Sequence, residues 1–301
     1  MPISSGPEMT DPWNLGDVVA ALHQSREAMH KIRHRGRLRE LPSRDVLMQV
    51  IAGLQAAMFP THYGRPDLSG ESIDFFVGDT LHGTLQLLVE QVRRALRFAD
   101  EASDDDPMPQ AVAITRAFAA RLAEIRALLV SDLHAAVNGD PAASNVSEVL
   151  LCYPGFSAIV HYRLAHALYR AGVPMLPRLI TSIAQAATGV DIHPAADIGG
   201  SFFIDHASGV VIGETTIIGR NVRLYQAVTL GAKSFPKDET GALVKGRPRH
   251  PIVEDDVVIY AGATILGRIT IGKGSVIGGN VWLTQSVPPG SNVTQAQMRS
   301  S

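Results

Sequence analysis

The first part of the chain has apolar residues at the three- and four-residue intervals of amphipathic helices. The clearest segments are 72–98 and 111–137, where an apolar stripe alternates with polar positions. Further helices are expected near 13–34, 44–58, 146–171 and 175–188. The acidic, proline-containing stretch 100–109 predicts a solvated linker between the two clear segments. We therefore expect residues 1–188 to form an N-terminal α-helical domain.

After residue 188 the apolar period changes to six. One series is Ile192, Ile198, Ile204, Val210, Thr216, Val222 and Val228, and a second is Val253, Ile259, Ile265, Ile271, Ile277 and Leu283. Helices repeat every 3.6 residues and ordinary strands every two, so neither sustains this spacing. A solenoid does, because each hexad forms one short face with its aliphatic residue inside. Three faces per coil predict about four coils over residues 189–290, followed by a short tail over 291–301.

A polar insertion separates the two series. Residues 231–251 are rich in proline, glycine and charged side chains, and the step from Val228 to Val253 is not a multiple of six. In a stack of coils, an insertion leaves its neighbours intact and protrudes as a loop. Loops held on rigid scaffolds commonly carry function, so this loop is a candidate part of a site.

Composition and charge describe an ordinary globular protein, with 46% hydrophobic residues and a net charge of −2. This balance gives no electrostatic support for a nucleic acid or an anionic membrane as partner. The N-terminus lacks the pattern of a signal peptide, and no apolar run is long enough for a membrane span. Cys152 is the only cysteine, which excludes an intrachain disulfide. We expect it to be a buried hydrophobe in a cytoplasmic protein.

Candidate chemistry begins at residues 205–215, which read DHASGVVIGET. Burial of Asp205 or His206 without a partner would be costly, so a plain core strand is a poor interpretation. His206 considered alone is a structural histidine by default. Its other interpretation is a general base, because imidazole titrates near neutral pH and can take a proton from an attacking hydroxyl.

Several segments taken together resemble the serine O-acetyltransferases of the hexapeptide-repeat, left-handed β-helix acyltransferases. They are DLHAAVNGDPAA (132–143), DIHPAADIG (191–199), DHASGVVIGET (205–215), QAVTLG (226–231), RHP (249–251) and GATILG (262–267). The resemblance implies an α+β fold, with the N-terminal helical domain followed by a C-terminal left-handed parallel β-helix. It implies transfer of acetyl from acetyl-CoA to the hydroxyl of L-serine, which gives O-acetyl-L-serine and CoA and begins cysteine biosynthesis from serine.

The resemblance also implies residue roles. His206 would be the general base, and Asp191 the carboxylate that fixes its tautomer and stabilises the imidazolium. Asp140 and Asp205 would bind the substrate ammonium. Arg249 would bind the substrate carboxylate, for which a planar bidentate donor is well suited.

The remaining roles concern the edges of the site. His250 and His193 are expected to complete the serine-binding set. The alternative role for His193 is to support the structure of the site. The alternative for Asp140 is to form the turn that ends a helix. Small residues should line the path of the acyl donor, and those implied are Gly231, Ala232, Ala261 and Gly262. Two positions depart from the family pattern: Ala232 replaces a usual glycine, and Val276 replaces a frequent lysine.

The resemblance implies acetyl-CoA as co-substrate, with no metal and no permanently bound cofactor. Free cysteine is expected to inhibit by feedback at the serine site. The expected assembly is a homotrimer, or a hexamer made as a dimer of trimers, with active sites between subunits. Because the chain ends in two serines and not in isoleucine, we expect no sulfhydrylase complex formed through the C-terminal tail.

Three other functions compete with this interpretation. A related hexapeptide-repeat enzyme could acetylate another small hydroxyl or amine. A solenoid zinc enzyme could use His193, His206 and His250, although their spacing lacks the close histidine pair expected there. A non-catalytic scaffold is the third alternative, because solenoids make extended binding surfaces.

Overall fold

The computed structural model describes residues 13, 15–29, 40–65, 67–100 and 105–295, which fall into two compact units divided between residues 40 and 41. In the first unit, helix α1 spans Leu15–Gln24 and the π-helical turn η1 spans Ser25–Met29. These elements confirm part of the helix expected at 13–34. The rest of that helix, the centre of the linker at 100–109 and the end of the tail at 291–301 lie outside the described residues.

The second unit begins with helices. They are α2 (Arg44–Met58), α3 (Pro60–Tyr63), α4 (Gly70–Ala99), α5 (Met108–Ala120), α6 (Leu122–Gly139), α7 (Val146–Cys152), α8 (Pro154–Arg170) and α9 (Leu176–Thr188). Ser43 begins α2, where its side chain accepts a hydrogen bond from the backbone N–H of Val46. Gly189 ends α9 in the left-handed conformation that glycine adopts without strain.

Two of the expected helices are divided. The segment 146–171 becomes α7 and α8, because Pro154 has no N–H with which to continue α7 and instead starts α8. The segment 111–137 becomes α5 and α6, which meet at Arg121. The prediction that Cys152 is buried was wrong, since this last residue of α7 is exposed. No helix among the described residues is both long and apolar enough to cross a membrane.

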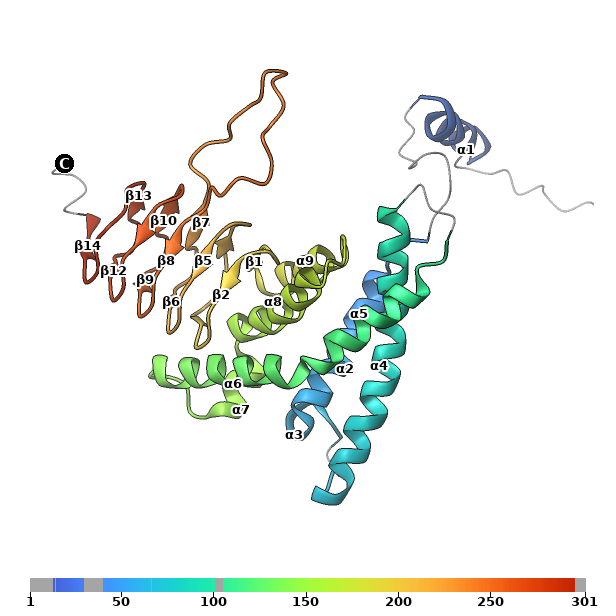
Figure 1. Ribbon diagram of the computed structural model, residues 1–301, viewed down its shortest axis with the longest axis horizontal. Coiled ribbons are helices and arrows are strands. Elements are labelled where there is room, and N and C mark those ends of the chain that lie inside the picture. Colours follow the sequence, from blue (N-terminus) through green and yellow to red (C-terminus); the bar gives the residue numbers. More distant parts are fainter. Residues whose placement is uncertain (1–12, 14, 30–39, 66, 101–104, 296–301) are drawn as a thin grey trace, which may run out of the picture. The chain divides into compact units, whose positions relative to one another are not determined.

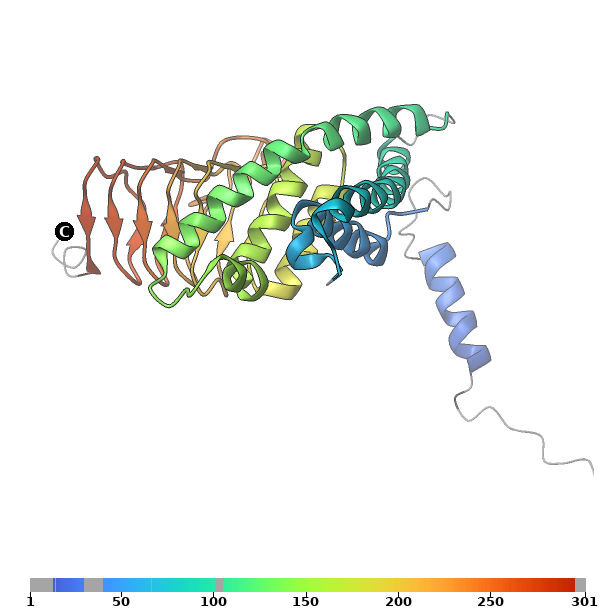
Figure 2. The ribbon, with the colours of Figure 1, turned by 90° about the horizontal axis from the view of Figure 1, so that it is seen from below.

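Residues 191–293 form a three-sided stack of coils built from short strands (Figures 1 and 2). The strands are β1 (Asp191–Ile192), β2 (Asp197–Ile198), β3 (Phe203–Ile204), β4 (Val211–Ile212), β5 (Ile217–Ile218), β6 (Arg223–Leu224), β7 (Thr229–Gly231), β8 (Ile252–Val253), β9 (Val258–Ile259), β10 (Thr264–Leu266), β11 (Thr270–Ile271), β12 (Val276–Ile277), β13 (Trp282–Leu283) and β14 (Asn292–Val293). They pair in parallel as three sheets, ordered β1-β4-β7-β10-β13, β2-β5-β8-β11 and β3-β6-β9-β12-β14. Consecutive strands therefore alternate among three faces, which confirms the predicted solenoid of about four coils.

The interior of the coils uses two buried positions in each hexad. One is the second residue of a strand, such as Ile192, and the other lies two residues earlier, such as Val190. The first predicted series moves from one position to the other after Ile204, because the turn between β3 and β4 is two residues longer than a regular one. Every member of the series is buried, so the six-residue apolar period gives no sign of the longer turn between β3 and β4.

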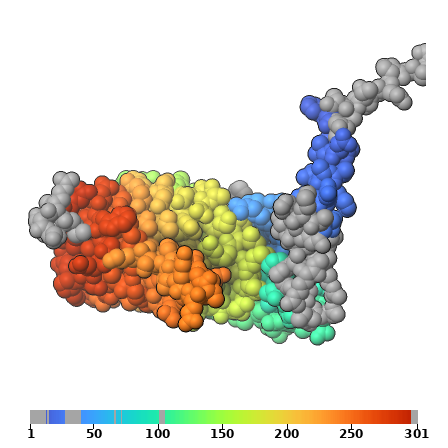
Figure 3. Space-filling model, turned by 90° about the horizontal axis from the view of Figure 1, so that it is seen from above, coloured from blue at the N-terminus to red at the C-terminus, as the bar shows by residue number. Residues whose placement is uncertain are grey.

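The insertion at 231–251 begins at the last residue of β7, ends before β8 and protrudes from the coils, as predicted (Figure 1). In the space-filling view it forms a bulge on their surface (Figure 3). An antiparallel bridge between Lys237 and Leu243 narrows the loop. The strands on both sides keep their register, since Ile217 pairs with Ile252 as if the insertion were absent.

A buried ion pair joins the helices to the first coil. Arg163 on α8 donates two hydrogen bonds, each of 3.0 Å, to the carboxylate of Asp132 on α6. The same guanidinium donates to the carbonyls of Ile198 and Gly199 at 2.5 Å each. The carboxylate also accepts from the backbone N–H of Phe202 at 2.8 Å. Helices α6 and α8 are thereby fixed against the loops of the first coil.

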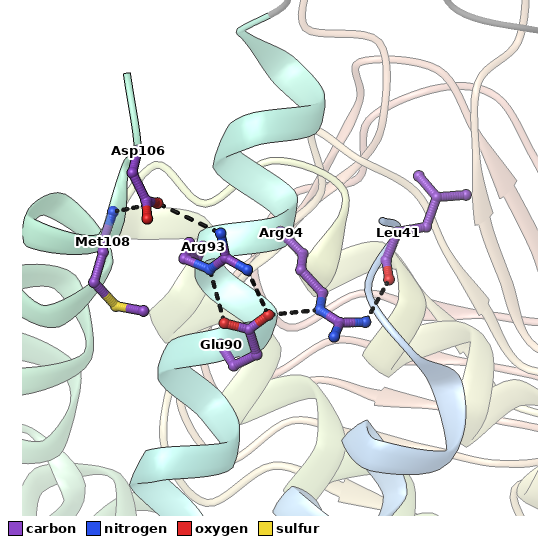
Figure 4. A network of polar contacts seen from close by, with 6 residues as sticks. All are labelled: Leu41, Glu90, Arg93, Arg94, Asp106 and Met108. Atoms are coloured by element: carbon purple, nitrogen blue, oxygen red, sulfur yellow. Dashed lines mark hydrogen bonds and ion pairs between the residues drawn. The ribbon is translucent and has the colours of Figure 1, made fainter. Parts of the chain in front are cut away.

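A second polar network fastens α4 to its neighbours (Figure 4). Glu90 accepts hydrogen bonds from Arg93 at 2.7 and 2.8 Å and from Arg94 at 2.8 Å. Arg93 also reaches Asp106, which precedes α5, and Arg94 reaches the carbonyl of Leu41, which precedes α2. The bond from Arg93 is the main reason why the pKa of Glu90 falls from its ordinary 4.5 to about 2.

This lowered pKa predicts a pH-dependent contribution to folding. Because the pKa of Glu90 is lower in the folded than in the unfolded chain, its stabilisation is present above about pH 4.5 and is lost as the pH falls towards 2. We expect Glu90→Gln to lower the free energy of unfolding by ~1 kcal/mol at pH 7, with a smaller deficit in acid. Urea unfolding at several pH values measures this difference.

The matched control for Glu90→Gln is Glu124→Gln, which removes a more exposed pair with Arg121. We expect that control to change stability less at neutral pH. A deficit for Glu90→Gln that stays constant from pH 7 to pH 3 would contradict the assigned role of Glu90.

Candidate active site

Two corners of the coil stack carry the candidate residues. The loops that precede strands of the β1-β4-β7-β10-β13 sheet form the first corner, which we call the His206 corner because His206 lies between β3 and β4. The loops that follow strands of the same sheet form the second, called the Arg249 corner because Arg249 lies between β7 and β8. Each corner gathers its own group of polar side chains.

At the His206 corner, the longer turn holds His206 outward. Asp205 follows the buried end of β3 and is itself buried, whereas the His206 side chain is 69% exposed. Nδ1 of His206 lies 3.9 Å from Oδ1 of Asp205. His206 and Ala207 have φ values of 58° and 70°, a left-handed conformation that costs energy in residues with a side chain. Other turns of the coils also place a residue with a side chain in this conformation, Asn221 and Ala227 among them, so the turn at His206 differs from them in its length.

Asp140 reaches the same corner from the end of α6. Its carboxylate accepts hydrogen bonds from the Tyr153 hydroxyl at 2.6 Å and from the backbone N–H of Ala142 at 2.8 Å. These bonds lower the pKa of Asp140, and the nearby charges of His206 and Arg223 lower it further. The bond to Asp140 raises the pKa of Tyr153 to about 12. At neutral pH, therefore, the carboxylate is ionised and the phenol keeps its proton.

Sequence reasoning missed two members of this group. Tyr153 belongs to no recognised motif, and only its place before Pro154 marks it as a helix boundary. Arg223 starts β6, and its guanidinium lies over the ring of Phe203 with 5.7 Å from Cζ to the ring centroid. A side chain at Gly139 would collide with this guanidinium, so the end of α6 lies directly against it.

At the Arg249 corner, an ion pair orients the arginine. Nη2 of Arg249 donates to Oε2 of Glu214 at 2.6 Å, and both side chains are about one third exposed or less. The backbone N–H of Arg249 is bound by the hydroxyl of Thr215 at 2.9 Å. Glu214 was not expected among the site residues, although it lies inside the GET end of the segment that carries His206.

His250 is buried beside Arg249. Its Nδ1 accepts a hydrogen bond from the backbone N–H of Thr215 at 3.1 Å. Burial, assisted by the charge of Arg249, lowers the pKa of His250 to about 4. The imidazole is therefore neutral at pH 7, and Nε2 carries its proton as a hydrogen-bond donor.

His193 lies near the same group, on the loop after β1. Its Nδ1 accepts from the backbone N–H of Ala195 at 3.1 Å. Burial lowers its pKa, the charge of Arg178 lowers it further, and the carboxylates of Glu214 and Asp191 oppose this. His193 thus belongs electrostatically to the Arg249 corner.

The structure brings some of the expected residues together and separates others. Asp140, Asp205 and His206 share one corner, while His193, Arg249 and His250 share the other. Asp191 starts β1, on the sheet between the two corners, beside Val211. No hydrogen bond or ion pair among the described residues joins Asp191 to His206. The role of Asp191 stays a prediction.

The small residues expected along the donor path are also divided. Gly231 and Ala232 lie at the end of β7, at the Arg249 corner, whereas Ala261 and Gly262 precede β10, at the His206 corner. Within the described part of the chain, no group of three or more His, Cys, Asp or Glu side chains is arranged to hold a metal ion. The three histidines of the zinc alternative lie at two different corners.

Comparison with known proteins identifies clear relatives. The family model "Serine acetyltransferase, N-terminal" matches residues 90–160, and "Bacterial transferase hexapeptide (six repeats)" matches residues 250–285. A plasmid-borne serine acetyltransferase of Synechococcus elongatus is 54% identical over 306 residues, which cover 99% of this chain and 96% of that protein. A serine acetyltransferase of Mycobacterium tuberculosis is 47% identical over 54% of this chain and 67% of its own length.

Solved structures agree with these relatives. Serine acetyltransferase 1 of Entamoeba histolytica, in complex with L-cysteine, is similar with a TM-score of 0.72 and 33% identity, covering 93% of this chain and 98% of that one. Soybean serine acetyltransferase complexed with serine is similar with a TM-score of 0.54 and 31% identity, covering 83% of this chain and 96% of that one.

The packing of His250 generates a prediction. A methyl group added at Gly213 would overlap the imidazole of His250, so Gly213→Ala should expel the ring towards solvent. Because burial is the main cause of the lowered pKa, we expect the pKa of His250 to rise from about 4 towards 6.5. NMR titration of the ring measures this change.

Gly78→Ala is the control for Gly213→Ala, since Gly78 lies inside α4 and a side chain there meets no atom within 4 Å. That substitution should leave the titration of His250 unchanged. An unaltered pKa of His250 in Gly213→Ala would show that the ring is not held by this contact.

Proposed function

Because the chain belongs to the serine acetyltransferases, as its full-length similarity to the Synechococcus relative shows, we propose that the His206 and Arg249 corners are the two halves of one active site. The predicted fold, a helical region followed by a left-handed parallel β-helix, is confirmed, and so is the prediction of a serine O-acetyltransferase. The boundary between domains at residue 188 stays a prediction. Acetyl-CoA is the proposed acetyl donor.

In the proposed mechanism, His206 removes the proton of the serine hydroxyl as that oxygen attacks the acetyl carbonyl. Its exposure gives a substrate direct access to the imidazole, which is the support for this role. When the thiolate of CoA leaves, the imidazolium can return the proton to it. Asp191 remains our proposed orienting carboxylate, and Asp205 supplies negative charge near Nδ1 at 3.9 Å.

The substrate ammonium is proposed to bind between Asp140 and Asp205. The hydroxyl of Tyr153 supports this role, because it holds Asp140 in one orientation and keeps it ionised. Tyr153 is thus a positioning residue for the ammonium site.

The substrate carboxylate is proposed to bind Arg249, with the Nε2–H of His250 as a second donor. The ion pair with Glu214 supports the first role, because it fixes the guanidinium plane before the substrate arrives. The low pKa of His250 supports the second, because a neutral ring with Nδ1 occupied can only donate from Nε2. His193 is proposed to line the same side of the site.

The separation of the two corners favours a shared active site. Roughly five extended residues at about 3.3 Å each separate them, so the corners of one chain lie roughly 16 Å apart. A single serine molecule is far shorter than that. A second copy, placed with its Arg249 corner beside the His206 corner of the first, would complete the site. If each copy makes this same contact with the next copy, the copies close into a ring. The shared site therefore supports the proposed homotrimer, or a hexamer of two trimers.

Further parts of the proposal follow from this arrangement. Gly231 and Ala232 of one copy would face Ala261 and Gly262 of the next along the path of acetyl-CoA.

The Entamoeba relative was solved with L-cysteine. Cysteine carries the same ammonium and carboxylate as serine, so we propose that it binds the same site as a feedback inhibitor. The lone Cys152 supports a cytoplasmic location.

The first test measures CoA release from acetyl-CoA with L-serine. We expect serine-dependent release by the wild type and a loss of about 10²–10⁴-fold in His206→Ala, the range for a lost general base. His134→Ala, which removes an exposed histidine on α6, is the control and should keep the wild-type rate. Release that depends on another acceptor would favour the alternative substrate class. An undiminished rate in His206→Ala would leave only the interpretation of His206 as a structural histidine.

The second test asks whether two subunits share each site. His206→Ala and Arg249→Ala are each expected to be inactive, but co-expressed chains form mixed trimers in which one site of three keeps both residues. Random assembly makes three quarters of the trimers mixed, so we expect about a quarter of the wild-type activity. Mixing the two purified variants without subunit exchange is the control. If both residues of a site came from one chain, co-expression would recover no activity.

A further inference from the structure

The row of side chains that begins at Asp205 continues as a pair of stacked aromatic rings. The register of β3, β6, β9 and β12 places Asp205, Tyr225, Tyr260 and Gly278 at the same position on four successive coils. The rings of Tyr225 and Tyr260 are nearly parallel, at 11°, with their centroids 4.9 Å apart. This is an offset stack of the kind that aromatic rings favour.

The row becomes more open with distance from Asp205. Asp205 is 8% exposed, Tyr225 is half-buried and Tyr260 is 43% exposed. One face of the Tyr260 ring is covered by Tyr225. The next position in the row carries no side chain, because it is Gly278. The outer face of the Tyr260 ring therefore faces the level of Gly278, a position without a side chain, and we call the space beside Gly278 the slot.

We propose that this slot holds the adenine of acetyl-CoA, stacked on Tyr260. The proposal rests on the proposed function, since it places the donor in the site where His206 acts. Aromatic side chains bind nucleobases through such stacking without reading the base edge, and a tyrosine with one uncovered face suits that contact. Tyr225 would act as a positioning residue that holds the Tyr260 ring flat.

The length of the row fits the donor. Parallel strands lie about 4.8 Å apart, so the slot at the fourth coil lies about 14 Å from the level of Asp205. The pantetheine arm between the thioester and the first phosphate contains about twelve chain bonds. At the rise per bond of an extended peptide, it reaches about 14 Å. A thioester placed at His206 would therefore bring the first phosphate, which carries the rest of the nucleotide, to the level of Tyr260 and Gly278.

The two residues beside the aromatic stack are small. Ala261 and Gly262 directly follow Tyr260 on the same corner. Gly262 has a φ of 71°, and a side chain there would collide with Oδ1 of Asn280 on the next coil. The side chain of Asn280 thus packs directly over Gly262, and residues 261 and 262 themselves bring only small side chains to the corner beside the aromatic stack.

The stack could instead serve only to stabilise the coils, as cross-strand aromatic pairs do. The two interpretations differ in which substrate they affect. We expect Tyr260→Ala to raise KM for acetyl-CoA by about tenfold, within the roughly 5- to 150-fold range of a lost base stack, while KM for serine stays unchanged. With S-acetylpantetheine, which lacks the nucleotide, Tyr260→Ala and wild type should have the same KM.

Two further variants sharpen the test. Tyr260→Phe keeps the ring and should retain the wild-type KM for acetyl-CoA. Phe75→Ala removes an exposed aromatic ring on α4, far along the chain from the coils, and should change neither KM. Light scattering of each variant establishes its assembly.

Three outcomes would overturn the proposal. They are an unchanged KM for acetyl-CoA in Tyr260→Ala, an equal rise with S-acetylpantetheine, and a loss of the wild-type assembly that raises both KM values together. If the wild type transferred acetyl to serine from neither donor, the proposed function itself would fail. In that case, calorimetry can still measure the affinity of CoA for the wild type and for Tyr260→Ala. A weaker affinity in the variant would support stacking of the adenine on Tyr260, and an equal affinity would contradict it.

Discussion

The bidentate pair between Asp132 and Arg163 is the interaction on which the geometry of the candidate site depends. A buried ion pair alone does little for stability, because desolvation offsets its attraction. Here the guanidinium also binds the carbonyls of Ile198 and Gly199, so its charge is satisfied from both the helices and the first coil. The pair thereby helps to hold α6 and α8 against the first coil. Asp140 follows α6 and Tyr153 precedes α8, so the placement of these two helices brings both residues near Asp205.

The coils provide the second part of the geometry. Parallel pairing repeats each corner at a fixed spacing, so residues far apart in sequence line up along one edge. The candidate site residues His206 and Arg249 lie where the coils depart from their regular repeat, and both departures are in turns between strands. The turn before β4 is lengthened at His206, and the turn after β7 is expanded into a loop that ends at Arg249. The sheet that separates these turns remains regular and rigid.

The apolar pattern was sufficient to predict the coils, α2 and α4, because each buries a regular series of side chains. It could not predict the lengthened turn at His206, because Ile204 and Val210 are both buried although they occupy different positions in their hexads. It also could not predict the division at Pro154 from helical period alone, or the exposure of Cys152. The site residues came from a family resemblance, which named Asp140 and Arg249 but not their partners Tyr153 and Glu214. Those partners depend on tertiary contacts that no local pattern encodes.

The insertion between β7 and β8 has a consequence for how this fold can vary. Its root is anchored, since Arg249 is bound by Glu214 and Thr215 of the neighbouring coil, and the strands on both sides keep their register. The tip, around Lys237 and Leu243, makes no contribution to that register. Additions or deletions at the tip can therefore accumulate through evolution while the spacing of the two corners is conserved. The loop is thus a region where related chains can diverge in their surface recognition without any cost to the geometry of acyl transfer.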